Sequence, residues 1–444
     1  MTEDRGRNIQ AGTVTLDTSD WERTPPAVKE AFAQSLTRCD GLTQVALRFR
    51  TIERLKLFTA FARMRPRLER SVVFVVDTPI PRHFKIASGL QRQGWSVVLL
   101  HRGPLPSDQR RFFSEALQYL DREECLVLAC LFSPVVYHVF SSWNFEVAEL
   151  FMVARPGKIV FESYDVLGGA LQPVIERSNT QIPVEKFCFE SADAVCSRNL
   201  QVRYARRTLG YKLPKRVLFF PDYCWNLNEQ LCTRLPKRTD GVHLVYVGGC
   251  GSVYFNAERQ KAGPNSKVCI EEITSRGLHY HIYPFIPNGD AVETAHPEYA
   301  ELARRNPMFH LHSCLSPAEV LREISQYHMG VFVSARGSLV EGDSFYRPEY
   351  FKLFTANKVF DYLDAGLPAL VGAGRLIDWL MDRTGAVELS YLDSLPQALD
   401  VLANPKRLAQ LATNADAARV MYGVERQALR LTKFYQVVGS QAAR

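Results

Sequence analysis

The chain has 444 residues, of which 46% are hydrophobic and 23% are charged. These values are ordinary for globular proteins and exclude a disordered or collagen-like chain. At roughly 100–200 residues per domain, the length predicts two or three domains. The 54 basic and 47 acidic residues leave a net charge of +7, far from the charge density of a dedicated nucleic-acid binder. We therefore expect no nucleic-acid partner.

The cysteines and the apolar runs indicate a reducing, non-secretory location. None of the 10 cysteines has C-x-x-C spacing, which argues against a zinc site or a disulfide framework. The first residues, MTEDRGRNIQ, lack the apolar core of a secretory signal. The longest apolar run, 125–140, is too short for a membrane span. We expect a cytoplasmic protein, either free or associated with the cytosolic face of a membrane.

Residues 1–70 predict a partly helical, basic N-terminal extension. Apolar residues recur at helical spacing over 52–64, with Phe58 and Phe61 on the apolar side. Segment 48–70 is strongly basic and is opposed only by Glu53 and Glu69. Two interpretations stay open: a peripheral contact with anionic lipid, which would suit a lipid-linked acceptor, or a solvated helix face.

From residue 71 onward, short apolar runs alternate with helical segments. Such runs are typical of strands buried on both faces of a parallel sheet, and the alternation predicts crossover units and a doubly wound sheet. We expect strands over 71–77, 95–100, 126–131, 135–140, 158–161, 194–197 and 216–220. We expect helices over 85–93, 145–154, 183–191 and 201–209.

A second alternating series follows a polar stretch. We therefore divide the chain into an extension (1–70), an N-terminal domain (71–225), a linker (226–241), a C-terminal domain (242–421) and a final helix (422–444). Further strands are expected over 242–247, 279–284, 309–312, 329–334 and 369–371, and further helices over 317–327, 358–365, 395–402, 406–418 and 423–438.

Ligands of open α/β sheets bind outside the carboxyl ends of the strands. The loop Gly248-Gly249-Cys250-Gly251 directly follows a strand, so Gly249 and Gly251 predict either a backbone that contacts a phosphate or sugar, or a tight turn. The stretch also matches part of the dinucleotide fingerprint, but its third glycine is missing.

A second candidate site begins at Asn357 and runs through a helix into the strand at 369–371. The helix N-terminus offers unpaired N–H groups and partial positive charge, and Lys358 adds a full charge, so this end suits a diphosphate. Asp361 lies one turn further on and can accept hydrogen bonds from a ribose diol. The alternative is a solvated lysine and aspartate on a surface helix.

Residues 357–371 resemble the nucleotide-sugar signature of GT-B glycosyltransferases, in particular glycosyltransferase family 4. Three further stretches, 190–197, 219–222 and 244–249, are similar to other parts of that family in the same order, and the resemblance covers roughly 71–440. It implies an α/β fold with two Rossmann-like doubly wound domains facing a cleft, a mostly helical N-terminal extension, and a last helix that crosses back. It also implies a glycosyltransferase of the hexosyltransferase type that uses a nucleotide diphosphate sugar in glycan biosynthesis, with no further cofactor.

The same resemblance implies roles for individual residues. Asp361 falls on the family's ribose-binding Glu, and Asn357 and Lys358 lie at the diphosphate. His138 and Asp165 fall near the strand-end residues that face the acceptor, where either could act as general base. The remaining expected donor contacts are Gly249, Gly251, Arg259, Lys261 and Ser334.

The chain departs from the family pattern at two places. Asp361 replaces the usual Glu, and Leu353 stands where retaining members have the first Glu of Glu-x7-Glu. The choice between retention and inversion therefore stays open. A catalytically weak binding or partner subunit, and a nucleotide-sugar epimerase of the same fold, stay as alternatives.

We expect no metal at the reaction centre, because the chain contains no D-x-D triplet. His279, His281, His310 and His312 have i, i+2 spacing on expected strands, but no carboxylate or cysteine pattern joins them in the sequence. We therefore interpret them as structural residues.

Overall fold

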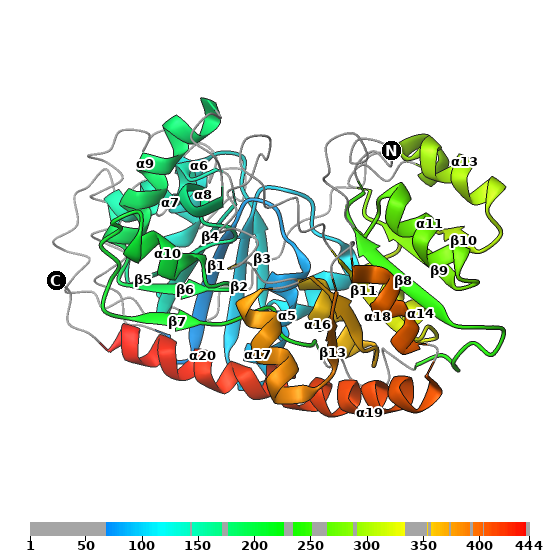
Figure 1. Ribbon diagram of the computed structural model, residues 1–444. Coiled ribbons are helices and arrows are strands. Elements are labelled where there is room, and N and C mark those ends of the chain that lie inside the picture. Colours follow the sequence, from blue (N-terminus) through cyan, green and yellow to red (C-terminus); the bar gives the residue numbers. More distant parts are fainter. Residues whose placement is uncertain are drawn as a thin grey trace, which may run out of the picture.

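The computed structural model contains two lobes, each built around one parallel sheet (Figure 1). It describes residues 68–142, 144–170, 176–225, 234–250, 264–286, 291–333, 353, 357–372, 374–390, 394–402 and 404–440. The expected extension therefore lies outside the described residues except for 68–70, and so do its basic segment and the helix over 52–64. The membrane contact predicted for that segment stays a prediction.

The first lobe contains a seven-stranded sheet with the order β3-β2-β1-β4-β5-β6-β7. Every pairing in it is parallel. The strands are β1 (Ser71–Val76), β2 (Ser96–His101), β3 (Glu115–Gln118), β4 (Val136–Ser141), β5 (Ile159–Ser163), β6 (Ala194–Ser197) and β7 (Val217–Phe219). All six residues of β1 are buried, as its uninterrupted apolar run predicts.

The second lobe contains a six-stranded parallel sheet with the order β10-β9-β8-β11-β12-β13. Its strands are β8 (His243–Gly248), β9 (His279–Pro284), β10 (Phe309–Leu311), β11 (Met329–Phe332), β12 (Ala369–Val371) and β13 (Val387–Leu389). Strand order reverses between β1 and β4 in one sheet and between β8 and β11 in the other. The predicted α/β fold with two doubly wound sheets is confirmed.

Helices cover both sheets and separate the strands along the chain. In the first lobe they are α5 (Pro81–Arg92), the 3-10 helix η1 (Ser107–Phe112), α6 (Arg122–Ala129), α7 (Glu146–Ala154), α8 (Leu167–Ala170), α9 (Glu176–Ser191) and α10 (Gln201–Arg207). In the second they are α11 (Lys267–Ser275), α12 (Val292–Ala295), α13 (Pro297–Arg305), α14 (Pro317–Ile324), α16 (Asn357–Asp364), α17 (Arg375–Thr384), α18 (Leu395–Leu402) and α19 (Pro405–Met421). The last helix of the chain is α20 (Val424–Gly439), which packs on the first lobe. No described helix is both long and apolar enough to cross a lipid bilayer.

The strand predicted over 126–131 is wrong, because most of this segment belongs to helix α6. Asp121 caps the helix by accepting a hydrogen bond from the Glu124 backbone, and two glutamates occupy its first turn. All residues from Cys125 to Ala129 are buried. A short helix buried on every side shows the same unbroken apolar run as a buried strand, so the run alone does not separate the two.

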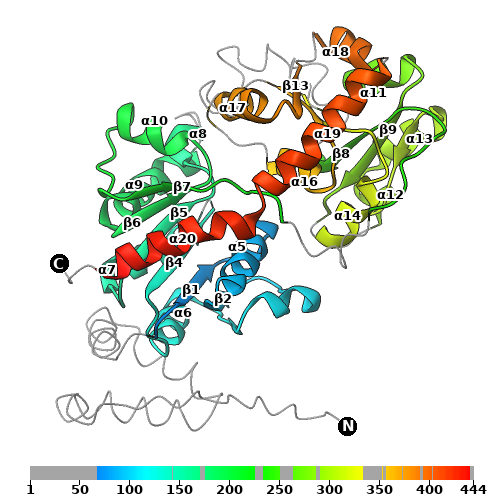
Figure 2. The ribbon, with the colours of Figure 1, turned by 90° about the horizontal axis from the view of Figure 1, so that it is seen from below.

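Helix α20 returns from the second lobe to the first and lies against α5 and β4 (Figure 2). A Cβ at Gly89 of α5 would lie 3.1 Å from the Ala428 Cβ and 3.2 Å from the Val424 carbonyl oxygen, so glycine permits this close approach. The two segments that connect the lobes run side by side. The Cys224 backbone N–H donates to the Tyr422 carbonyl at 3.0 Å, and the Val424 N–H donates to the Cys224 carbonyl at 2.8 Å.

Six of the chain's 10 histidines gather in the second lobe. We call them the histidine row: His243 on β8, His279 and His281 on β9, His310 on β10, and the adjoining His312 and His328. The His243 and His279 rings stack at 4.2 Å with an interplanar angle of 2°. Burial and the neighbouring rings lower the pKa of His243 to about 4, and burial with the nearby His310 lowers that of His312 to about 4. The folded chain therefore favours neutral imidazoles here.

The Tyr435 hydroxyl of α20 lies 2.6 Å from His138 Nδ1 of β4, in the fully buried interior. We expect Tyr435→Phe to lower the free energy of unfolding by about 1–3 kcal/mol, because it leaves a buried ring nitrogen without its partner. Urea denaturation measures this change. Tyr204→Phe on α10 is the control, because no described residue bonds its hydroxyl, and an equal loss in both variants would contradict the assignment.

The histidine row predicts a stability that depends on pH. The rings of His243 and His312 bind protons more readily in the unfolded chain, at a pKa near 6.5, than in the folded chain, at about 4. Their contribution is fully present above pH 6.5 and is lost as the pH falls toward 4. We expect the free energy of unfolding to decline between pH 6.5 and pH 5, above the range where most carboxylates titrate. The decline should be shallower in His312→Gln, and an unchanged slope would contradict the prediction.

Candidate functional site

The candidate site lies where the N-terminus of α16 meets the carboxyl ends of β8 and β11. Helix α16 packs against β11, and its first residue, Asn357, bonds to Tyr164 and Arg198 of the first lobe. The first four N–H groups of a helix have no partner within it and carry partial positive charge. The site therefore combines these N–H groups with side chains from both lobes.

Lys358 extends from α16 across the end of β8. Its ammonium lies 4.9 Å from the centre of the Phe332 ring and 5.7 Å from that of Tyr246. Gly248, with φ of +136°, makes room for it, because a Cβ there would lie 2.2 Å from Lys358 Cε. Two aromatic faces and a glycine thus fix the position of one cation.

No described carboxylate forms an ion pair with the Lys358 ammonium. Burial lowers its pKa, whereas the charge of Asp361 acts in the opposite direction. A cation that has lost much of its water without gaining a bound counter-charge gains from an anionic ligand. This electrostatic feature makes the end of α16 a candidate anion site.

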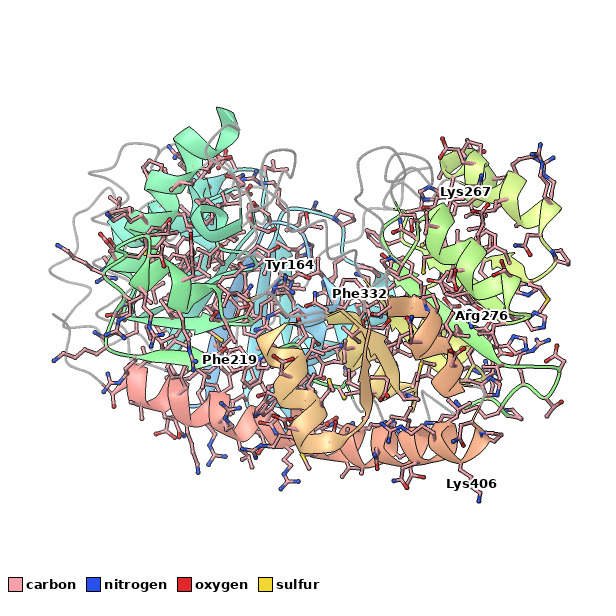
Figure 3. The ribbon with its side chains drawn as sticks, in the orientation of Figure 1. Tyr164, Phe219, Lys267, Arg276, Phe332 and Lys406 are labelled. Carbon is pink, nitrogen blue, oxygen red and sulfur yellow. The ribbon has the colours of Figure 1, made fainter. Side chains whose placement is uncertain are left out.

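Arg198, directly after β6, joins the two lobes beside this anion site. Its guanidinium stacks over the Tyr164 ring at 3.5 Å, and its Nε donates to the Tyr164 carbonyl at 2.5 Å. Its Nη2 lies 3.0 Å from Asp165 Oδ1, and its Nη1 donates to Asp222 Oδ2 at 3.3 Å. Nη1 also donates to Asn357 Oδ1 of α16, and Asn357 Nδ2 donates to the Tyr164 hydroxyl. Figure 3 shows Tyr164 and Phe332 near the junction of the lobes.

Asp222 connects Arg198 to a second buried arginine. Its Oδ1 accepts a hydrogen bond from Arg82 Nη1 at 3.2 Å, so one carboxylate lies between two guanidinium groups. The Arg82 Nε in turn lies 2.5 Å from Glu162 Oε1 of β5. Although burial alone would raise it, the pKa of Glu162 lies below its usual range because Arg82 and His138 stabilise the charged form.

An ion pair joins the lobes one turn further along the same face of α16. Lys85 Nζ of α5 lies 2.6 Å from Asp361 Oδ1, with side-chain exposures of 4% and 32%. The same ammonium donates to the Tyr223 carbonyl at 3.3 Å. Burial opposes its charge, but Asp361 and Asp364 raise the pKa of Lys85 above its usual value. Asp361 Oδ2 has no bonded partner among the described residues and stays open to another donor.

The structure brings most of the described candidate residues together. Asn357, Lys358 and Asp361 share the first turns of α16, Asp165 reaches this region through Arg198, and Gly249 follows β8. The Gly249 carbonyl accepts a hydrogen bond from the Tyr246 hydroxyl at 2.8 Å. Four other candidates lie outside the described residues: Gly251, Arg259, Lys261 and Ser334.

His138 lies apart from this group. It sits in the middle of β4 with 0% exposure, and its Nε2 is 3.4 Å from Glu162 Oε2. Burial lowers its pKa, although Glu162 opposes the shift. No surface of the ring meets solvent, so this placement favours a structural role. The catalytic role of His138 stays a prediction that we do not carry further.

Sequence reasoning missed Lys85, Tyr164, Arg198 and Asp222. Arg198 and Tyr164 directly follow the ends of β6 and β5, where ligand-facing residues are expected, so their position was an available signal. Lys85 gave no such signal, because its partner Asp361 lies 276 residues away.

Asp222→Asn removes the carboxylate that, among the described residues, bonds to both buried arginines. We expect the free energy of unfolding to fall by about 3 kcal/mol, because the two guanidinium groups stay buried without their shared counter-charge. Asp378→Asn is the control, because that aspartate is exposed on α17, and we expect a change within about 0.5 kcal/mol. Urea denaturation of both variants tests this, and equal stabilities would contradict the bridging role.

Comparison with known proteins supports the fold. No protein-family model matches the chain, and no curated protein matches it. Among solved structures, the sucrose-phosphate synthase of Thermosynechococcus elongatus superposes with a TM-score of 0.55 at 14% identity, over 83% of this chain and 99% of that one. The Anabaena protein HepE, crystallised in complex with UDP, superposes with a TM-score of 0.55 at 10% identity, over 82% and 98%. At these identities the similarity shows the fold alone, which is the two-domain GT-B architecture.

Proposed function

We propose that the protein is a glycosyltransferase that moves a sugar from a nucleotide diphosphate sugar to an acceptor hydroxyl. The observation that carries this proposal is the Lys358 ammonium, which lies at the N-terminus of α16 and has no ion pair with a described carboxylate. Glycosyl transfer builds negative charge on the departing diphosphate, and fixed cations and helix N–H groups stabilise that charge. HepE, which shares the fold, was crystallised in complex with UDP.

In this proposal the second lobe holds the donor. The N–H groups of α16 and Lys358 bind the diphosphate, and Asn357 is oriented for it by Arg198 and Tyr164. Asp361 Oδ2 accepts a hydrogen bond from the ribose while Oδ1 stays with Lys85. Gly249, Gly251, Arg259, Lys261 and Ser334 complete the expected donor contacts.

In this proposal the first lobe holds the acceptor. Asp165 follows β5 at the junction and is held in place by Arg198, so in an inverting reaction it acts as the general base. In a retaining reaction the departing phosphate takes the acceptor proton instead. Either route proceeds without a metal at the reaction centre, and the acceptor is a glycan, lipid-linked or protein hydroxyl.

Thermal unfolding with UDP, GDP, ADP, dTDP or CMP tests the donor site. We expect one nucleotide to stabilise the protein, by about 2.7 kcal/mol at a concentration 100 times its dissociation constant. Lys358→Ala and Asp361→Ala should lose most of this effect. Lys406→Ala should keep it, because Lys406 is also the second residue of its helix but is exposed on α19, away from the junction (Figure 3).

Absence of stabilisation by all five nucleotides, or equal stabilisation of Lys358→Ala, would contradict the donor site. Sugar transfer to an acceptor then separates the proposed enzyme from the alternatives. Nucleotide binding without transfer indicates a binding or partner subunit, and conversion of the sugar nucleotide without an acceptor indicates an epimerase.

A further inference from the structure

The histidine row contains a group of three potential metal ligands. The ligand atoms of Asp240, His243 and His279 all lie within 4.8 Å of one another. They come from the turn before β8 and from the first residues of β8 and β9, where His243 and His279 are register partners. Sequence spacing did not join a carboxylate to His279, whereas the parallel pairing of β8 with β9 brings this histidine beside His243 and the nearby Asp240.

We propose that Asp240, His243 and His279 form a binding site for Zn²⁺ or another first-row divalent cation. Two imidazoles and one carboxylate suit these ions, and a solvent molecule would complete a four-coordinate site. The site is at the amino end of β8, where His243 lies five residues and roughly 16 Å along the strand from Gly248 and the proposed donor site. It is therefore separate from the proposed reaction.

Each imidazole has the supporting partner that a metal-bound histidine needs. His243 Nδ1 lies 2.8 Å from His281 Nε2, and His279 Nδ1 lies 2.9 Å from His310 Nε2. If each Nδ1 carries the proton and donates it to the next ring, the lone pair of each Nε2 is left for the ion. Such second hydrogen bonds orient metal-binding histidines and select the tautomer.

The carboxylate is oriented as well. Asp240 Oδ1 lies 3.1 Å from His243 Nε2 and also accepts a hydrogen bond from Arg238 Nε at 3.0 Å, while Arg238 Nη2 donates to Asp240 Oδ2 at 2.6 Å. An ion at this site would therefore share the carboxylate with Arg238. The Asp240 side chain is 53% exposed, which gives an ion a path from solvent. Arg238 lowers the local affinity for a cation by its charge, but it also fixes the carboxylate, as the second shell of metal sites commonly does.

The turn before β8 leaves the second histidine uncovered. Gly241 has φ of +138°, and a Cβ there would lie 3.5 Å from His279 Nε2. Glycine therefore keeps a side chain away from the nitrogen that would bind the ion. The His243 and His279 rings lie in nearly parallel planes, at an interplanar angle of 2°, and an imidazole lone pair lies in its ring plane, so binding of one ion by both rings requires them to tilt toward each other.

Equilibrium dialysis of the full chain against Zn²⁺ tests the site, and Co²⁺ absorption reports the geometry. We expect one ion per chain. Asp240→Asn and His279→Gln should each weaken binding by at least about 10-fold, and His310→Gln, which removes a supporting bond, by about 10-fold. His296→Gln and Cys314→Ser should bind as the unchanged chain does, because both residues lie outside the group of three.

Three results would overturn the proposal. The first is that the chain binds no Zn²⁺. The second is that both Asp240→Asn and His279→Gln bind Zn²⁺ as tightly as the unchanged chain. The third is that Cys314→Ser is the only variant that loses binding. Asp240 is an exposed side chain, so Asp240→Asn keeps the test valid if a histidine variant unfolds. Nucleotide stabilisation should be unchanged in Asp240→Asn, so failure of this site and failure of the donor site are separate outcomes.

Discussion

The structure depends on one carboxylate, that of Asp222, held between the buried guanidinium groups of Arg82 and Arg198. Two arginines this close repel each other unless a negative charge lies between them. Arg82 is anchored to β5 through Glu162, and Arg198 extends to Asn357 in the other lobe. A continuous series of bonds therefore runs from Glu162 of β5 through Arg82, Asp222 and Arg198 to Asn357, and it holds the N-terminus of α16 against the first lobe.

The same network explains why α20 returns to the first lobe. Tyr435 of α20 binds His138, which lies beside Glu162, so the final helix contacts the buried charges that position α16. Together with the paired segments at Cys224 and Tyr422, this fixes both ends of the connection between the lobes. The fold thus couples the C-terminal helix to the candidate site through hydrogen bonds as well as through apolar packing.

The sequence predicted the parts of the site that are contiguous and failed where partners are distant. Asn357 and Lys358 were found because a strand, a loop and a helix start follow one another in the chain. Lys85 was missed because no local pattern reports an ion pair spanning 276 residues. The interpretation of 126–131 as a strand failed for another reason, since burial on all sides removes the periodicity that separates helix from strand.

Arg198 and Lys358 both lie where the two lobes meet, but they differ in how many of their N–H groups are already hydrogen-bonded within the protein. Arg198 donates hydrogen bonds to Tyr164, Asp165, Asp222 and Asn357. A diphosphate would have to displace these partners to bind Arg198. Lys358 lies on aromatic faces, which neither accept its protons fully nor neutralise its charge. The structure therefore uses arginine to hold the lobes together and leaves lysine to meet an incoming anion.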